Sequence, residues 1–238
     1  MVAVEVLAVK EKPSDQSACN HVGYDGLARV YWWLEFALFQ NRLRNARLAL
    51  IGSLDGKLID SPRVLVLGDG DGRLLVHLCR AMPSASFISV DQSNEMLRLQ
   101  QLRIGQRDAG RVRWIQADAS EVDESKVPPE TYDLLITAFI CDCFSAETLE
   151  RCLPVWIQSL KSNGLLYWAD FVQPESGWRH YRAKFYLGLM QWFFRRTTSY
   201  SNAQLVDIPA ILVRQSIACI DCKTTDHGLI ETRLYQRR

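Results

Sequence analysis

Glycine and aspartate alternate directly after a short apolar run: Val64-Leu65-Val66-Leu67 is followed by Gly68-Asp69-Gly70-Asp71-Gly72. A glycine-rich turn between a buried strand and a helix lets a ligand approach backbone N–H groups and the helix N-terminus, which a side chain would obstruct. Asp91 follows about 20 residues later, where a carboxylate can accept both hydroxyls of a ribose. These residues predict a nucleoside-binding site, against the alternative of a structural turn and a solvated aspartate.

The spacing of the glycines excludes two common nucleotide-binding motifs. The dinucleotide fingerprint places its third glycine three residues after the second, and here Arg73 occupies that position. The chain also contains no Gly-Lys-Ser or Gly-Lys-Thr, which excludes a P-loop. A nicotinamide dinucleotide is therefore not the expected ligand.

Short apolar runs alternate with longer stretches between residues 62 and 172. The runs are too continuous for half-exposed strands and predict central strands of a parallel sheet that is covered on both faces. The predicted strands are Arg63–Leu67, Ser86–Val90, Val112–Ala117, Tyr132–Ala138 and Leu165–Phe171, and the predicted crossover helices are Arg73–Met82, Asn94–Arg107 and Ser145–Lys161, the last ended by Asn163-Gly164. This alternation indicates a doubly wound α/β fold.

The flanking segments are predicted to be mostly helical. Apolar residues at helical spacing from Trp32 to Leu50 predict a long amphipathic helix, with arginines that include Arg47 on its polar remainder. Further helices are expected over Ser176–Thr198 and Asn202–Val213. Two strands then follow, Gln215–Lys223 and Leu229–Gln236, joined through Asp226-His227-Gly228.

The composition is that of an ordinary soluble protein. With 28 Lys and Arg against 27 Asp and Glu, the formal net charge is +1, which disfavours a nucleic-acid partner because phosphate backbones are bound through a positive excess. No apolar stretch is long enough for a membrane span, and the opening residues lack the basic start of a signal peptide. Seven cysteines scattered through apolar segments suggest reduced thiols, so a cytoplasmic location is expected, while the oligomeric state is left open.

Five segments resemble, in order and spacing, the motifs of class I S-adenosylmethionine-dependent methyltransferases, the ubiquinone/menaquinone-type and related small-molecule enzymes among them. The segments are VLVLGDGDG, SVDQSNEM, IQADAS, YDLLITAF and LKSNGLLYWADF. The resemblance implies S-adenosylmethionine as cofactor and a Rossmann-like sheet of seven strands with an antiparallel C-terminal hairpin strand. The chain is then expected to be one domain, 1–238: a leader and N-terminal helical cap (1–58), a cofactor-binding core (59–172), a helical cap (173–214) and a C-terminal β-hairpin (215–238).

The resemblance also implies which residues contact each part of the cofactor. They are Gly68, Asp69 and Gly70 for the methionine part, Asp91 for the ribose, Gln92, Met96, Asp118 and Ala119 for the adenine, and Thr137 and Ala138 beneath the sulfonium. Tyr24 and Tyr31 match a Tyr/Asp–Ala–Tyr pattern that folds over the cofactor in related C-methyltransferases. One departure is Val66, since many members have an acidic residue two positions before the first glycine.

The acceptor side is predicted from chemistry. Methyl transfer is a direct displacement, so the protein must align the acceptor and remove its proton where necessary. In related small-molecule enzymes a polar residue after the fourth strand faces the acceptor, which makes Asp142 the candidate base. The alternative is that Asp142 caps the following helix or faces water. The neighbouring Cys141 and Cys143 are expected to be packing residues, because the Pro-Cys nucleophile of RNA cytosine-C5 enzymes is absent.

Two further patterns bear on ligands. Aromatic residues in both flanking helices suggest a small, apolar or aromatic acceptor, with contact to a membrane surface only weakly supported. Cys219-x-x-Cys222 falls in a predicted strand, where positions three apart point to opposite faces, and it has no second cysteine pair. We therefore expect no metal site.

Two other functions fit the same motifs. The glycine turn also resembles that of spermidine synthase, an aminopropyltransferase that uses a decarboxylated form of the same cofactor, although Thr137–Phe144 does not reproduce the acidic motif of such enzymes. A non-catalytic member that binds the cofactor as a partner or scaffold is the second alternative. An open, aromatic-lined acceptor pocket would favour an enzyme, and a sealed pocket would favour the scaffold.

Overall fold

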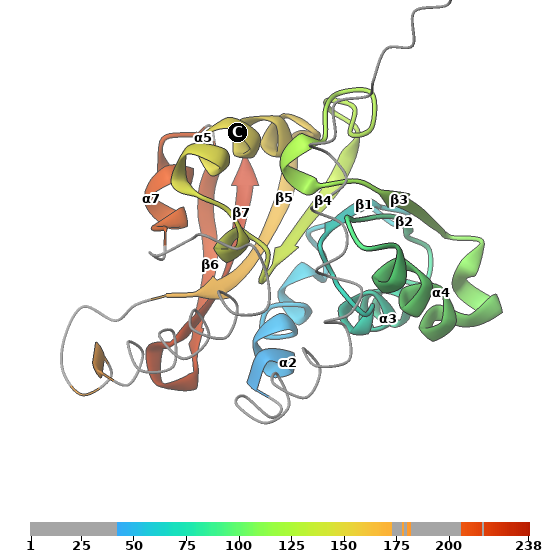
Figure 1. The fold of residues 1–238 in the computed structure, drawn as a ribbon, viewed down its shortest axis with the longest axis horizontal. Coiled ribbons are helices and arrows are strands. Elements are labelled where there is room, and N and C mark those ends of the chain that lie inside the picture. Colours follow the sequence, from blue (N-terminus) through green and yellow to red (C-terminus); the bar gives the residue numbers. More distant parts are fainter. Residues whose placement is uncertain (1–41, 173–177, 179, 182–205, 216) are drawn as a thin grey trace, which may run out of the picture.

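The computed structural model describes residues 42–172, 178, 180–181, 206–215 and 217–238. Its centre is a sheet of seven strands in the order β3-β2-β1-β4-β5-β7-β6 (Figure 1). The strands are β1 (Arg63–Leu67), β2 (Ser86–Asp91), β3 (Val112–Gln116), β4 (Tyr132–Ala138), β5 (Leu160–Phe171), β6 (Ile217–Thr225) and β7 (Ile230–Arg237). Strands β1 to β5 pair in parallel, and β7 lies antiparallel between β5 and β6. The predicted doubly wound sheet with a reversed last strand is confirmed.

Three crossover helices follow the first, second and fourth strands: α3 (Arg73–Ala81), α4 (Asn94–Ala109) and α5 (Ala146–Gln158). Two of them begin where a serine hydroxyl accepts an otherwise unpaired N–H group of the first turn. Ser93 accepts the Met96 N–H at 3.3 Å, and Ser145 accepts the Thr148 N–H at 3.1 Å. Among the described residues, no helix is both long and apolar enough to cross a membrane.

Helices cover both faces of the sheet, and each face has its own apolar core (Figure 1). On one face α2 (Arg42–Arg47) and α3 pack on Val64 and Val66 of β1. On the other face α5 and α7 (Ile208–Val213) pack on Leu65 and Leu67 of the same strand. Burying one such side chain contributes about 1.5–3 kcal/mol, and β1 contributes buried side chains to both cores, so both cores stabilise it at the centre of the sheet.

The described part of the N-terminal helix is shorter than predicted. Helix α2 ends at Arg47, and a turn leads to a 3-10 helix, η1 (Gly52–Leu54). Leu43, Ala46 and Leu50 are nevertheless buried together, as the helical spacing predicts. The rest of this helix, and almost all of the helix expected over Ser176–Thr198, lie outside the described residues.

The prediction that Asn163-Gly164 ends the third crossover helix is wrong. Helix α5 ends at Gln158, and Ser159 caps its C-terminus. The chain enters β5 at Leu160, which pairs with Tyr132, so Asn163 lies inside the strand span in a left-handed conformation with φ 64°. Burial of Leu160 explains the early entry, because this side chain is fully buried in the core under α5.

Candidate cofactor and acceptor site

The glycine-rich turn leaves the carboxyl end of β1 with all three glycines in the left-handed region. Their φ angles are 65°, 64° and 83° for Gly68, Gly70 and Gly72. A Cβ atom on Gly68 would lie 2.4 Å from Ile140 Cδ1, and one on Gly72 would lie 2.9 Å from Gln100 Cγ. A Cβ atom on Gly70 would meet nothing within 4 Å. Two glycines therefore serve close packing, while Gly70 borders open space where a ligand can approach the backbone.

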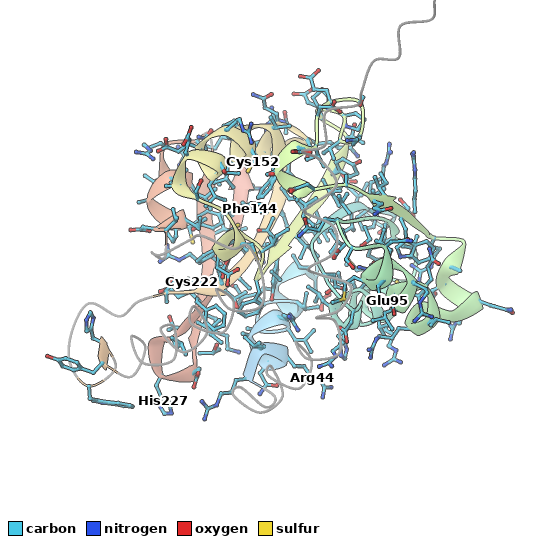
Figure 2. All side chains as sticks on the ribbon, in the orientation of Figure 1. Arg44, Glu95, Phe144, Cys152, Cys222 and His227 are labelled. Carbon is cyan, nitrogen blue, oxygen red and sulfur yellow. The ribbon has the colours of Figure 1, made fainter. Side chains whose placement is uncertain are left out.

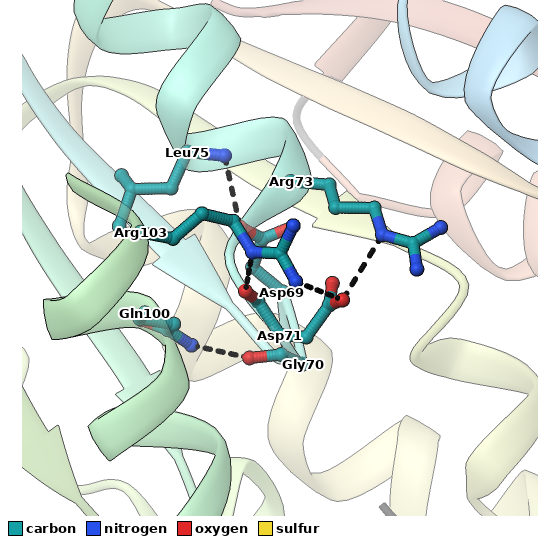
Figure 3. Close-up of polar contacts among 7 residues, drawn as sticks. All are labelled: Asp69, Gly70, Asp71, Arg73, Leu75, Gln100 and Arg103. Atoms are coloured by element: carbon teal, nitrogen blue, oxygen red, sulfur yellow. Dashed lines mark hydrogen bonds and ion pairs between the residues drawn. The ribbon is translucent and has the colours of Figure 1, made fainter. Parts of the chain in front are cut away.

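Helix α4 holds this turn in place (Figure 3). Gln100 is fully buried, accepts the Ser89 hydroxyl at 2.7 Å and donates to the Gly70 carbonyl at 2.8 Å. Arg103 donates to the Asp71 carbonyl at 2.9 Å and pairs with the Asp71 carboxylate at 2.8 Å. The sequence did not predict either Gln100 or Arg103 as a residue that holds the turn. Their spacing of three residues places both on one side of α4, but this indicates a contact only once α4 is known to lie beside the turn.

Asp91 lies at the carboxyl end of β2, beside the turn. It is 8% exposed, and its Oδ2 accepts the Gly70 N–H at 3.2 Å while Oδ1 accepts the Ser93 N–H at 3.0 Å. Burial raises the pKa of Asp91 to about 6, and the two N–H bonds oppose the rise. The carboxyl is thus ionised at neutral pH, and each oxygen keeps a lone pair for a hydroxyl donor.

Asp69 has a structural task within the turn. Its Oδ2 accepts the Leu75 N–H at 2.8 Å in the first turn of α3. Burial raises its pKa to about 7, and the Leu75 bond and the Arg47 charge oppose the rise. The side chain therefore anchors α3, whereas a contact of Asp69 with the methionine part of the cofactor stays a prediction.

The predicted adenine contacts lie at the ends of two neighbouring strands, β2 and β3. Asp118 uses Oδ1 to accept the Ser120 N–H at 2.8 Å and the Ser120 hydroxyl at 2.7 Å. The Ala119 carbonyl accepts the buried Trp156 indole N–H at 2.9 Å, which ties this loop to α5. Gln92 and Met96 come from the adjacent β2–α4 segment, and their contacts with adenine stay predictions.

The predicted acceptor side is built after β4. Thr137 and Ala138 are buried, and Phe139 turns the chain with φ 59° into a 3-10 helix, η3 (Cys141–Cys143). Within η3, Asp142 donates its main-chain N–H to Oδ2 of Asp170 at 3.2 Å. Asp170, at the end of β5, is 2% exposed and was not predicted as a site residue.

Asp142 does not cap the following helix, because Ser145 does so. Its Oδ1 is buried and has no hydrogen-bond partner among the described residues. Burial raises the pKa of Asp142 to about 6, against opposing hydrogen bonds from η3 and the charge of Arg47. Phe144, labelled in Figure 2, follows η3. Its ring packs against Trp156 with ring centroids 6.1 Å apart.

Arg47 at the end of α2 brings a positive charge to this edge. The polar helix face was expected to be exposed, but Arg47 is only 9% exposed and its guanidinium lies over the Phe139 ring at 5.2 Å. Its charge opposes the raised pKa of both Asp69 and Asp142. Arg47 therefore links the glycine turn to η3 electrostatically.

The thiols near the site are held neutral. Burial raises the pKa of Cys141 and Cys143 well above the ordinary value, and nearby carboxylates add to the rise. Since a thiolate is the nucleophilic form, neither cysteine suits attack at neutral pH. Tyr24 and Tyr31, the predicted lid residues, lie outside the described residues.

Cys219 and Cys222 lie on one face of the hairpin, and the prediction that they point to opposite faces is wrong. Strand β6 has a register irregularity after Cys219, so Cys219 pairs with Tyr235 and Cys222 with Arg233. Those partners are two residues apart on β7, which places both exposed thiols on one face of the hairpin. Among the described residues, no group of three or more His, Cys, Asp or Glu side chains is arranged to hold a metal ion.

A groove of about 390 Å³ lies at the opposite edge of the sheet. It is lined by η1, the segment before β1 and the end of α3, through residues that include Leu54, Asp55, Pro62 and Met82. Because these residues precede β1 or follow α3, the groove opens at the amino ends of the strands. It is therefore separate from the glycine turn and Asp142.

Known proteins are similar to this chain in sequence motif or in fold. Residues 64–164 match the family model described as a methyltransferase domain, and no curated protein matches the chain. A possible exported protein from Bordetella parapertussis is 22% identical, with a TM-score of 0.63 over 82% of this chain and 68% of that chain. The N-methyltransferase NodS from Bradyrhizobium japonicum WM9, solved with S-adenosyl-l-homocysteine, is 12% identical, with a TM-score of 0.62 over 90% of this chain and 98% of that chain.

A third similar structure is an O-methyltransferase family 2 protein from Planctomyces limnophilus in complex with apigenin. It is 15% identical, with a TM-score of 0.64 over 89% of this chain and 62% of that chain. At these identities the structures establish a shared fold, and the family model adds the domain type. The resemblance seen in the motifs is confirmed: residues 64–164 match a methyltransferase domain, and the chain has the Rossmann-like fold of the class I S-adenosylmethionine-dependent methyltransferases.

Proposed function

We propose that this protein transfers the methyl group of S-adenosylmethionine to a small, apolar or aromatic molecule. The observation that carries the proposal is the pairing of Gly70 with Asp91: an open backbone position hydrogen-bonded to a buried carboxylate at the end of the next strand. This donor and acceptor set suits a nucleoside. When bound, S-adenosylmethionine supplies an electrophilic methyl group on its sulfonium.

The residues of the turn fit the cofactor by their own geometry. Asp91 keeps lone pairs for two ribose hydroxyls, and Gly70 leaves room that any other residue would fill. Val66 leaves the amino group of the methionine part without the usual acidic partner. Of the acids near the turn, Asp69 is already engaged with α3 through Leu75.

Asp142 is proposed to take the proton that the acceptor loses. A general base must be ionised at working pH and must reach the proton it removes. A pKa of about 6 leaves Asp142 mostly ionised at neutral pH. Its buried Oδ1 accepts no hydrogen bond from any residue that the structure describes. Ser145 takes the capping role that was the alternative for this residue.

Aromatic residues near Asp142 and a ligand of a similar structure support an apolar or aromatic acceptor. Phe139 and Phe171 pack with tilted rings, 5.2 Å between centroids, and Phe144 lies two positions after Asp142, so aromatic residues occur on both sides of the candidate base in the sequence. The similar O-methyltransferase family 2 protein was solved with apigenin, and NodS is an N-methyltransferase, so oxygen and nitrogen acceptors both occur on this fold.

Calorimetry with the full chain tests the cofactor first. S-adenosylhomocysteine should bind in the micromolar range and nicotinamide dinucleotides should show no heat of binding. Tighter binding of decarboxylated S-adenosylmethionine than of S-adenosylmethionine itself would point instead to aminopropyl transfer. A screen of phenols, amines and other small metabolites with methyl-labelled S-adenosylmethionine then tests catalysis, and binding without transfer to any acceptor would favour the non-catalytic alternative.

A further inference from the structure

Arg47 is held at the end of α2 by two hydroxyl groups of the sheet. The Tyr167 hydroxyl of β5 donates to the Arg47 carbonyl at 2.9 Å, and the Thr232 hydroxyl of β7 donates to the neighbouring Ala46 carbonyl at 2.9 Å. Tyr167 and Thr232 are both fully buried, so water does not compete for these hydrogen bonds. The side chain of Arg47 therefore extends from a backbone position that β5 and β7 fix.

The guanidinium of Arg47 lies where β4 ends, beside the glycine turn. It is buried over the ring of Phe139, 5.2 Å from the centroid, and Phe139 directly follows β4. The next residue, Ile140, packs against the turn, since a Cβ atom on Gly68 would lie 2.4 Å from its Cδ1. The charge of Arg47 also acts on Asp69 within the turn. A buried cation thus stands where the end of β4 meets the turn.

Two other arginines near the turn bind an acid of the protein itself. Arg73 and Arg103 both pair with the Asp71 carboxylate, at 3.0 Å and 2.8 Å (Figure 3). Both side chains are also partly exposed, so water weakens their attraction to any further anion. A hydrogen bond made by the buried guanidinium of Arg47 is stronger, because the surroundings have a lower dielectric constant. Arg47 is therefore better suited than either of them to bind an anionic group of a ligand.

The methionine part of the cofactor carries the group that such a guanidinium recognises. Arginine keeps its charge at any working pH, and its planar fork of N–H donors matches the two oxygens of a carboxylate. The ribose and adenine contacts are predicted at the ends of β2 and β3, which leaves the methionine part for the turn and the end of β4. S-adenosylmethionine bears one anionic group, its carboxylate, and two cationic groups, its ammonium and sulfonium. Arg47 with the nearby acids Asp69 and Asp142 offers the complementary set of charges.

We propose that Arg47 binds the carboxylate of S-adenosylmethionine and makes the site selective for this cofactor over its decarboxylated form. This inference rests on the proposed function. A ligand without the carboxylate cannot make the charged hydrogen bonds with the guanidinium, so it binds more weakly. Aminopropyl transfer, the alternative activity that the glycine turn allows, uses the decarboxylated cofactor. Arg47 is thus the residue that favours methyl transfer over that alternative.

Titration calorimetry of the full chain with S-adenosylmethionine and decarboxylated S-adenosylmethionine tests this role, because the two ligands differ only in the carboxylate. The wild type should bind S-adenosylmethionine roughly 10- to 150-fold more tightly, the range expected for a hydrogen bond between charged groups. In the neutral variants Arg47→Met and Arg47→Gln this ratio should fall to about threefold or less, because only the affinity for S-adenosylmethionine drops. One foldable variant is sufficient, since the ratio is measured within one protein.

Arg44→Met is the matched control, because Arg44, labelled in Figure 2, is exposed on the same helix and the substitution removes the same charge. It should keep the wild-type ratio. Equal affinity of the wild type for the two ligands would overturn the role of Arg47 without any variant, and so would a wild-type ratio in the neutral Arg47 variants. Failure of the wild type to bind S-adenosylhomocysteine rejects the proposed function, whereas intact binding with either of those results rejects the role of Arg47 alone.

Discussion

Replacement of Asp91 by asparagine should weaken cofactor binding without weakening the fold. The carboxylate already accepts the N–H groups of Gly70 and Ser93, and a bound ribose would add two hydroxyl donors. A hydrogen bond to a charged acceptor contributes about 1.5–3 kcal/mol. Asparagine has the same size but one acceptor oxygen and no charge, so at least one such bond is lost. The affinity for S-adenosylhomocysteine should then fall by roughly 10- to 150-fold.

The stability of the ligand-free protein should change in the opposite direction. Because the pKa of Asp91 is raised from 3.8 to about 6, keeping this group ionised in the folded state at pH 7 costs up to roughly 3 kcal/mol relative to a neutral group. The cost appears as pH rises from the unfolded pKa to the folded one and is absent below pH 4. After subtracting about 1 kcal/mol for an N–H group that asparagine leaves unpaired, Asp91→Asn should be about 2 kcal/mol more stable at pH 7.

The assay combines titration calorimetry with urea unfolding at pH 7.5 and pH 5. Wild-type affinity should decline as pH falls through 6, since the carboxylate becomes protonated, and the variant should show little of this dependence. Asp133→Asn, at the other edge of the sheet, is the control and should bind as the wild type does. Unchanged affinity in Asp91→Asn would refute the ribose site, and a joint loss of affinity and stability would show that the residue acts through the fold.

Three further outcomes are expected. Gly72→Ala should destabilise the protein by about 2 kcal/mol or more and weaken S-adenosylhomocysteine binding, because φ is 83° and the new Cβ would lie 2.9 Å from Gln100 Cγ. The control Gly105→Ala, whose new Cβ meets nothing within 4 Å, should cost only the strain of its positive φ. Equal urea midpoints for the two variants would contradict this prediction. If residues 1–35 close over the cofactor, hydrogen exchange there should slow when S-adenosylhomocysteine binds, and identical exchange would remove the segment from the site. Asp142→Asn should keep cofactor affinity within about threefold but lower the single-turnover methylation rate by roughly 10²–10⁴-fold, and a change below threefold would mean that catalysis is mainly alignment.

The amino-acid sequence by itself determines the strands, the turn and the edge where they meet. Continuous apolar runs such as Tyr132–Ala138 predict central strands, and the observed β4 has these bounds. Glycines after the first run and Asp91 after the second lie at the carboxyl ends of neighbouring parallel strands, which share one edge of the sheet. These features depend on local periodicity and on backbone conformation, so one amino-acid sequence is sufficient to predict them.

Tertiary structure alone decided which other side chains lie beside the candidate site residues. Asp170 reaches η3 because β5 pairs with β4, and Arg47 becomes buried because α2 packs beside Phe139, although its helical position indicated exposure. A single irregularity in β6 brings Cys219 and Cys222 to one face, against the two-residue alternation of a regular strand. Each of these outcomes depends on the packing of segments far apart in the chain, and local patterns of residue type carry no information about such packing.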